Sequence, residues 1–307
     1  MLMQRSKKDY VVLAGKGMLM GAADAVPGVS GGTVAFITGI YEELIHSIRQ
    51  CGPEALKTLF SQGLKAFWTQ INGTFLLTLV SGILFSLVTL SRVVLYLLDQ
   101  HPVLLWSFFF GLILASTWSV MRHTGRVSLN VLAVFLLGAV VALQITSMTP
   151  VVTDPSYFMI FISGMIAICA MILPGISGSF ILLLLGMYAP VLMALKGFQL
   201  DFIGVFVLGC VTGLLSFSHF LSWAFAHYRV LTLSLLGGFM LGSLNMVWPW
   251  KYTLAYSING QGEELPLQQK NILPDTFSAL TGQDPLTLVA IGLMLAGMVL
   301  VLILDKR

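Results

Sequence analysis

The chain has 307 residues, of which 57% are hydrophobic and 9% are charged, and its mean hydropathy is +0.92. These values exclude a soluble globular protein and predict a polytopic membrane protein. A chain this apolar, with a formal net charge of +3, is also not expected to bind nucleic acid.

The chain begins with a short basic arm at residues 1–10 and an apolar run that contains Lys16. No small-residue cleavage site follows, so we expect a retained segment and not a cleavable signal peptide. Two helical arms, at 11–27 and 33–48, are separated by the helix-breaking sequence Pro27-Gly28-Val29-Ser30-Gly31-Gly32-Thr33. An arm of about 15 residues spans roughly 22 Å, which is less than the ~30 Å hydrocarbon core. Residues 11–48 are therefore predicted to form a re-entrant hairpin.

The next segments complete a first repeat and begin a second one. Apolar residues of 53–71 share one helical face, which predicts an interfacial amphipathic helix. Spanning helices are then expected at 73–98, 103–121 and 127–147. A second hairpin follows at 157–195, with spans at 201–226, 230–249 and 285–304. The long polar loop 250–284 between the last two spans is expected to form an external cap or lid.

The two hairpins have matching sequences. Pro27, Gly28, Ser30, Gly31, Gly39 and Tyr41 each have an identical residue 147 positions later, at Pro174, Gly175, Ser177, Gly178, Gly186 and Tyr188. We therefore divide the chain into repeat one, 1–150, and repeat two, 151–307. Each repeat has one hairpin and three spans, an odd number of crossings, so the second copy must enter from the opposite face. The predicted fold is an all-α polytopic membrane protein with an inverted-topology repeat.

The distribution of basic residues gives this topology a direction. With the N-terminus inside, twelve basic residues fall on the cytoplasmic side and three, Lys196, Lys251 and Lys270, fall outside. This asymmetry is typical of a multi-pass membrane protein whose N- and C-termini are both cytoplasmic.

The two breaks are candidate binding sites. Each starts a new helix at depth, and irregular backbone in a membrane is tolerated where it is buried in protein or lines a polar cavity. The free N–H groups of such a helix start attract anions, and phosphate is the natural ligand. The predicted binding residues supply backbone donors and hydroxyls: Ser30, Gly31, Gly32, Thr33, Ser177, Gly178 and Ser179. The alternative is a kink that serves tight packing.

Four ionisable residues in apolar surroundings are further candidates. Asp24 lies one turn before Pro27 and has Met171 at the matching position, so it is predicted to carry a proton or to pair with a cation, or else to be a structural cap. Glu42 and Glu43 follow as gating candidates or as a solvated helix face. Arg92, near the outer end of its span, is predicted to reach an anionic headgroup, or else to snorkel outward.

Motifs for covalent chemistry are not recognisable in the sequence. It has no Walker loop, zinc signature or Ser-His-Asp arrangement, and its three cysteines, Cys51, Cys169 and Cys210, are scattered. We therefore expect no cofactor, no metal and no enzymatic activity.

Two stretches carry a resemblance to a known family. Gly21-Ala22-Ala23-Asp24-Ala25-Val26-Pro27-Gly28-Val29-Ser30-Gly31-Gly32-Thr33, with Tyr41-Glu42-Glu43-Leu44, and Leu173-Pro174-Gly175-Ile176-Ser177-Gly178-Ser179 are similar to the polyprenyl-phosphate translocases of bacteria and archaea, the PopT family. The resemblance covers essentially the whole chain. It implies a flippase that returns undecaprenyl phosphate from the outer to the inner leaflet for cell-envelope synthesis.

A second family resembles the chain in outline. Undecaprenyl-diphosphate phosphatases also have re-entrant hairpins, with a Pro-Gly-x-Ser-Arg-Ser motif, but this chain has Gly31 and Gly178 where that motif has arginine. The group expected to hold a transferring phosphoryl is therefore missing. A polyprenyl-diphosphate phosphatase and a secondary transporter of a small soluble anion remain the alternatives to the flippase.

Overall fold

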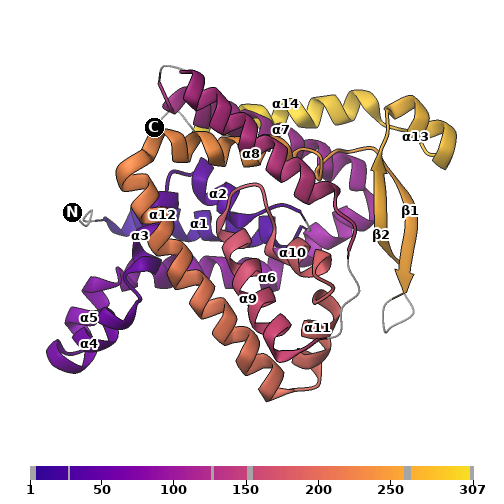
Figure 1. Cartoon of the computed structure of the whole chain (residues 1–307). Helices are drawn as coiled ribbons and strands as arrows, with labels where there is room; N and C mark the ends of the chain where they lie inside the picture. The colour runs from indigo at the N-terminus through magenta and orange to yellow at the C-terminus, as the bar shows by residue number, and fades with distance from the viewer. Residues whose placement is uncertain (1–4, 27, 126–127, 151–154, 259–263, 305–307) are drawn as a thin grey trace.

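The structure is a computed structural model that describes residues 5–26, 28–125, 128–150, 155–258 and 264–304. Pro27, the first residue of the first predicted break, and Arg126 lie outside the described residues. The described chain forms fourteen helices and one pair of strands (Figure 1).

The helices of the first half are α1 (Lys7–Asp24), α2 (Gly31–Ile37), α3 (Tyr41–Arg49), α4 (Pro53–Gln62), α5 (Leu64–Gln70), α6 (Gly73–Gln100), α7 (Pro102–His123) and α8 (Leu129–Ser147). The elements of the second half are α9 (Tyr157–Ile172), α10 (Gly178–Leu184), α11 (Tyr188–Lys196), α12 (Leu200–Ser243), β1 (Lys251–Ile258), β2 (Glu264–Asn271), α13 (Pro274–Thr281) and α14 (Thr287–Leu304). Local sequence explains several helix starts, because Ser6, Ser30, Ser128 and Ser156 each accept a hydrogen bond from the first turn of the following helix.

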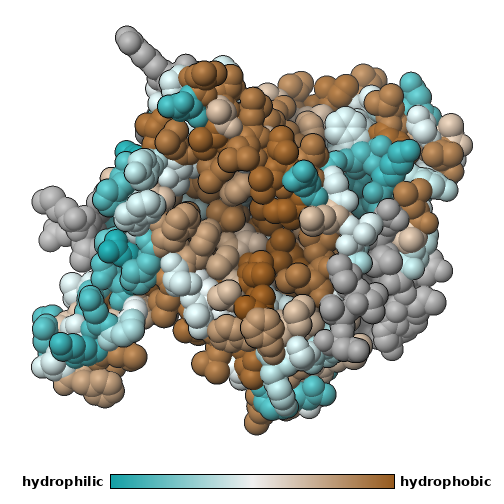
Figure 2. All heavy atoms as spheres, in the orientation of Figure 1, coloured by the Kyte–Doolittle hydropathy of each residue, from teal (hydrophilic) through white to brown (hydrophobic). Residues whose placement is uncertain are grey.

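The expected membrane character is confirmed. By length and hydropathy, α6, α7, α8 and α12 can each cross a membrane, and the bent pair α10–α11 raises the number of candidate spans among the described residues to five. Exposed hydrophobic side chains cover the outer faces of α6, α8 and α12, including Val88, Leu136 and Leu208. Figure 2 shows hydrophobic residues across the middle of the molecule and hydrophilic ones at its left edge and upper right.

The spans expected at 201–226 and 230–249 are not separated by a loop. They form a single helix, α12, of 44 residues that would be about 66 Å long if straight, roughly twice the hydrocarbon thickness. Tyr228 interrupts it with a non-helical backbone (φ −135°, ψ 42°), and Figure 1 shows the bend. The two expected spans are therefore joined directly at Tyr228, without a loop between them.

The returning arms of the two hairpins are also more broken than expected. The predicted helix 33–48 is α2 and α3, separated at Gly39 (φ 71°), and its counterpart is α10 and α11, separated at Gly186 (φ 68°). The axes of α10 and α11 differ by 107°. Positive φ is accessible to glycine at low cost, so both bends depend on that residue type. Similarly, the interfacial segment 53–71 is divided into α4 and α5 at Gly63 (φ 82°).

The polar loop 250–284 is folded, and it departs from the all-α prediction. β1 and β2 pair in antiparallel register from Lys251 opposite Asn271 to Ile258 opposite Glu264, and α13 follows. Trp248 and Trp250 fix the base of this unit, because their indole N–H groups donate to the carbonyls of Ile272 and Pro285 at 2.8 Å. The unit lies at the opposite end of the molecule from α3 (Figure 1).

Glycines bring helices into close contact in the same way in both halves. A Cβ on Gly17 of α1 would lie 2.4 Å from the Leu79 carbonyl oxygen of α6, and one on Gly164 of α9 would lie 2.5 Å from the Phe206 carbonyl oxygen of α12. The second half of α12 packs in turn on α8, where Gly238 meets the Phe135 carbonyl oxygen. These close contacts hold the first arm of each hairpin against a long apolar helix.

Candidate functional site

The first helix break joins α1 to α2 through buried residues. Gly28 has φ 88°, and Val26 and Val29 are almost completely buried. Ser30 is the N-cap of α2, and its hydroxyl oxygen accepts a hydrogen bond from the Gly32 N–H at 3.1 Å. Ser30 therefore caps the helix that begins at the first break.

The donors of the first break already have an internal anion. The Gly31 N–H donates to Oδ1 of Asp24 at 2.6 Å, across the break from the last residue of α1. Because the Gly32 N–H donates to Ser30, the first two N–H groups of α2 are both occupied. The expectation of free N–H groups is therefore wrong for this break, where Asp24 takes the position of an anionic ligand.

The second break has the same backbone but lacks that carboxylate. Gly175 has φ 92°, close to the value at Gly28, and α10 begins after Ser177. No side chain of the described residues caps α10, and the Ser177 and Ser179 hydroxyls contact each other at 2.8 Å. Met171 lies at the position that matches Asp24. The second break therefore keeps backbone and hydroxyl donors without an internal anion.

The two breaks contact each other. The Ser30 hydroxyl donates toward the carbonyl oxygens of Met171 and Leu173, at 3.1 and 3.2 Å, and the Gly175 N–H donates to the Thr33 hydroxyl oxygen at 2.9 Å. A hydroxyl has one hydrogen, so the two carbonyls share it. We call the residues of this contact, Asp24, Ser30–Thr33 and Met171–Ser179, the junction. Ser30 and Thr33 are at most 1% exposed and Ser177 is 6% exposed, so the junction is a buried polar centre.

The other predicted site residues lie away from the junction. Glu42 pairs with Arg229 at 2.8 Å, with both side chains exposed, and Glu43 pairs with Arg5 and accepts a hydrogen bond from Asn72. Arg92 is exposed on α6, and no hydrogen bond or ion pair among the described residues joins it to either break. The structure therefore brings together Asp24 and the residues of the two breaks, but not Glu42, Glu43 or Arg92.

Two cavities lie on opposite ends of the helices. The α3 pocket, of about 500 Å³, is lined by Tyr41, Glu42, Glu43, the end of α7 at His123, and Arg229. The β-hairpin pocket, of about 320 Å³, is lined by the end of α8, by α10 at Phe180 and Leu183, and by Lys251, Lys270 and Asn271. α7 begins beside the β-hairpin pocket, where Trp106 contacts Lys251, and ends at the α3 pocket. The two pockets therefore face opposite sides of the molecule.

Lys251 was not singled out from the sequence. It starts β1, outside the membrane-spanning helices, and its ammonium lies 4.0 Å from the centre of the Trp106 ring and donates to the Met246 carbonyl at 2.5 Å. Desolvation lowers the pKa of Lys251 to about 7. The local sequence contains no signal for this, because the aromatic ring that Lys251 contacts lies on α7 and not in the neighbouring Trp248-Pro249-Trp250.

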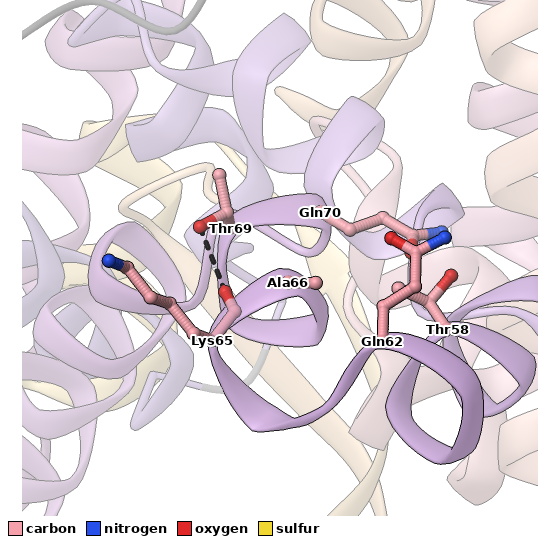
Figure 3. A pocket seen from close by; sticks show the side chains of 6 residues that line it. All are labelled: Thr58, Gln62, Lys65, Ala66, Thr69 and Gln70. Atoms are coloured by element: carbon pink, nitrogen blue, oxygen red, sulfur yellow. Dashed lines mark hydrogen bonds between the residues drawn. The ribbon is translucent and has the colours of Figure 1, made fainter.

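Another cavity lies away from the junction. It measures about 710 Å³ and lies between α4 and α5, where Thr58, Gln62 and Gln70 gather and Lys65 points away from them (Figure 3). None of the predicted site residues lines it, and it is an open hollow on the interfacial segment. We therefore do not place the site there. No three His, Cys, Asp or Glu side chains of the described residues gather to hold a metal ion.

Comparison with known proteins agrees with the resemblance seen in the two breaks. A family model described as undecaprenyl phosphate translocase-like matches residues 20–265. A polyprenyl-phosphate transporter of Vibrio cholerae is 54% identical over 298 residues, which cover 97% of each chain. A polyprenyl-phosphate transporter of Staphylococcus aureus is 33% identical over 252 residues, 76% of this chain and 84% of that protein. No solved structure matches the chain.

Proposed function

The chain belongs to the undecaprenyl phosphate translocase-like family, and from that premise we propose that it carries polyprenyl phosphate across the membrane as an intact lipid. In this proposal it is a flippase that returns undecaprenyl phosphate from the outer to the inner leaflet of the bacterial cytoplasmic membrane for cell-envelope synthesis. It forms no covalent intermediate, and glycines at 31 and 178 support this, because neither can hold a transferring phosphoryl group by its side chain.

The proposed architecture is an inverted repeat of residues 1–150 and 151–307, with both termini cytoplasmic. Two observations support it. The helix order and the glycine bends of α1–α2–α3 recur in α9–α10–α11, and α1 packs on α6 as α9 packs on α12. If the two hairpins are re-entrant from opposite faces, the junction lies near the middle of the membrane, where inverted-repeat transporters place their substrate sites.

The observation that carries the proposal is the contact between the two breaks. A phosphate that crosses hydrocarbon without assistance loses its hydration at a large cost, and a buried polar junction offsets that cost. We assign the phosphate first to the hydroxyls and backbone donors of Ser177, Gly178 and Ser179. Ser30, Gly31, Gly32 and Thr33 are proposed to join it when their present hydrogen bonds open. The isoprenoid tail stays among lipid chains beside the apolar outer helices.

Asp24 has a specific part in this proposal. Its carboxylate occupies the Gly31 N–H, so a phosphate can take the first break only when that hydrogen bond opens. Protonation of Asp24 removes the internal anion and makes the donor available. Asp24 is therefore proposed as the proton-coupled group that alternates with the substrate.

The remaining charges act at the entrances. The pair Glu42–Arg229 connects α3 to the kink of α12, and the pair Glu43–Arg5 connects α3 to the segment that precedes α1, so we propose that these pairs gate the α3 pocket. Arg92 is proposed to attract the headgroup from the exposed face of α6, where its planar fork suits phosphate. In that role, Arg92→Ala weakens lipid binding more than Arg92→Lys does.

A leaflet-accessibility assay tests the proposal. Purified protein is placed in liposomes that contain polyprenyl phosphate, and a phosphatase that cannot cross the bilayer is added outside. Without protein, hydrolysis stops when the outer leaflet is exhausted; with protein, we expect it to continue until the inner leaflet is consumed. Hydrolysis that stops at the same level with and without protein would reject the flippase. Phosphate release from polyprenyl diphosphate by the protein alone would establish a phosphatase instead.

A further inference from the structure

The β-hairpin pocket combines polar walls with two lysines. Its described lining includes no aspartate or glutamate, although it includes Lys251, Lys270, Asn245 and Asn271. Lysines in protein cavities are usually paired with acids, because an unpaired buried charge is costly. The described lining therefore favours an anion as the ligand of this pocket.

Hydrogen bonds hold the wall of the pocket in place. The Asn271 amide donates to the backbone and side-chain oxygens of Asn245 at 2.8 and 2.9 Å, and the Asn245 amide donates to the Thr146 hydroxyl at 3.2 Å. These contacts join β2 to the ends of α8 and α12. The asparagine N–H donors are thus committed to the wall, so the lysines must supply most of the attraction for a ligand.

Lys251 is held in the pocket and not extended into water. The Trp106 ring lies under its ammonium at 4.0 Å, and one N–H donates to Met246. An ammonium has three N–H donors, so this arrangement fixes the charge while other donors remain for a ligand. Lys270 adds a second, exposed cation on the neighbouring strand.

The pocket also adjoins the junction through α10. Phe180 and Leu183 form part of its wall, and Phe180 directly follows Ser179 of the second break. A ligand in the pocket therefore lies along the same short helix whose start contributes to the junction.

We propose that the β-hairpin pocket binds a phosphate group, carried as a lipid monoester or as the free ion, and that it is the site from which the substrate enters the second break. Phosphate binding in the pocket does not depend on transport, whereas entry of the substrate into the second break rests on the proposed function.

Binding of two probes, polyprenyl phosphate in maltoside micelles and inorganic phosphate, tests the inference. We expect Lys251→Gln to weaken lipid binding roughly tenfold or more, because it removes a charge-assisted hydrogen bond. Lys251→Arg, which keeps the charge, restores most of the affinity. Lys57→Gln is the matched control, since Lys57 is exposed on α4 and far along the chain from the pocket.

A second variant guards against misfolding, because Lys251 also packs on Trp106. Lys270→Gln removes an exposed cation without disturbing that packing, and we expect a roughly threefold weaker affinity. If the variants lose affinity for both probes, the pocket recognises the phosphate group itself. If they lose affinity for polyprenyl phosphate alone, the pocket recognises the lipid. Wild-type affinity for both probes in Lys251→Gln and Lys270→Gln overturns the pocket but leaves transport intact, whereas an inactive wild-type protein in liposomes overturns the proposed function.

Discussion

The two helix breaks have nearly the same backbone and different charge. At the first break the Asp24 carboxylate accepts the Gly31 N–H, whereas at the second break Met171 takes the matching position and no side chain of the described residues caps α10. The φ angles of Gly28 and Gly175 are 88° and 92°. The difference between the breaks is therefore chemical and not conformational.

In the proposed mechanism, this difference gives the two breaks separate tasks. The second break has donors without an internal anion, so it is suited to receive a phosphate first. The first break has to release Asp24 before it can take part. A transporter must bind and release the same headgroup, and a break that carries its own competing anion provides a means of release.

Gly32→Ala should have the largest effect, because it separates the two breaks. A Cβ at Gly32 would lie 2.5 Å from the Ile172 carbonyl oxygen and 3.1 Å from that of Met171. Backbone atoms cannot retreat cheaply, so we expect the free energy of unfolding to fall by about 1–3 kcal/mol and transport to fall roughly tenfold or more. The liposome assay and thermal unfolding in detergent measure both.

Gly15→Ala is the matched control for that variant. Gly15 lies within α1, and nothing is within 4 Å of the Cβ that alanine would add. Alanine in a helix interior is favoured over glycine by about 0.5–1 kcal/mol, so this variant should be as stable as wild type or more so, with unchanged transport. Equal loss of transport in both variants would contradict the role of the junction.

Asp24→Asn should have the next largest effect, because it makes the first break uncharged like the second. The amide oxygen can still accept the Gly31 N–H, so folding is retained. We expect transport to fall roughly three- to tenfold, because a neutral amide competes less well than a carboxylate for the Gly31 N–H and so releases the phosphate more slowly, and we expect the pH dependence of transport to flatten. A wild-type pH profile in this variant would show that Asp24 is a structural cap.

Alanine substitutions of the serines at the two breaks should lower the stability of the protein by different amounts. The Ser30 hydroxyl caps α2 and donates across the junction, whereas the described contact of the Ser177 hydroxyl is with Ser179. We expect Ser30→Ala to lower the free energy of unfolding by about 1–2 kcal/mol and Ser177→Ala by about 0.5 kcal/mol. Chemical denaturation of the two variants measures the difference. A larger loss of unfolding free energy for Ser177→Ala would contradict the conclusion that Ser30 contributes more to the stability of the junction.

The smallest predicted effect is a pH dependence beside the second break. Because the pKa of Lys251 is lowered to about 7, its positive charge is present below that pH and is lost as the pH rises. Lys270 is the other cation of the described lining. Phosphate binding should weaken roughly two- to fivefold between pH 6.5 and 8.5 relative to Lys251→Arg, whose guanidinium stays protonated. The same dependence of phosphate affinity on pH in the wild type and in Lys251→Arg would contradict this prediction.

The parts of the fold that could be predicted depend on local sequence. The two breaks, the Ser30 cap of the first one and the spans α6, α7 and α8 follow from proline, glycine, serine and hydropathy patterns. The second bends at Gly39 and Gly186 were missed although the two glycines are in register, because a glycine within an apolar helical run does not by itself mark a break.

The parts that could not be predicted depend on distant contacts. Asp24 caps Gly31 only because the chain turns back between them, and the repeat pattern indicates the position of Asp24 but not its partner. Lys251 is enclosed by Trp106, which lies 145 residues earlier on another helix. The β-hairpin is different, because it had a local signal that was overlooked: the apolar residues Tyr252, Leu254, Tyr256 and Ile258 occupy every second position of β1, a pattern typical of a strand.

The central claim is that the phosphate of the substrate occupies the junction. Solid-state NMR that recouples ³¹P to ¹⁵N tests it directly in protein labelled at glycine amides, in phosphorus-free glycolipid bilayers with polyprenyl phosphate as the sole phosphorus source. One N–H···O–P hydrogen bond places nitrogen and phosphorus about 4–5 Å apart. We predict dephasing of a few glycine signals, including one that disappears in Gly178→Ala. The described lining of the β-hairpin pocket contains no glycine, so dephasing reports the junction. Bound lipid without dephasing of any glycine signal would contradict the account.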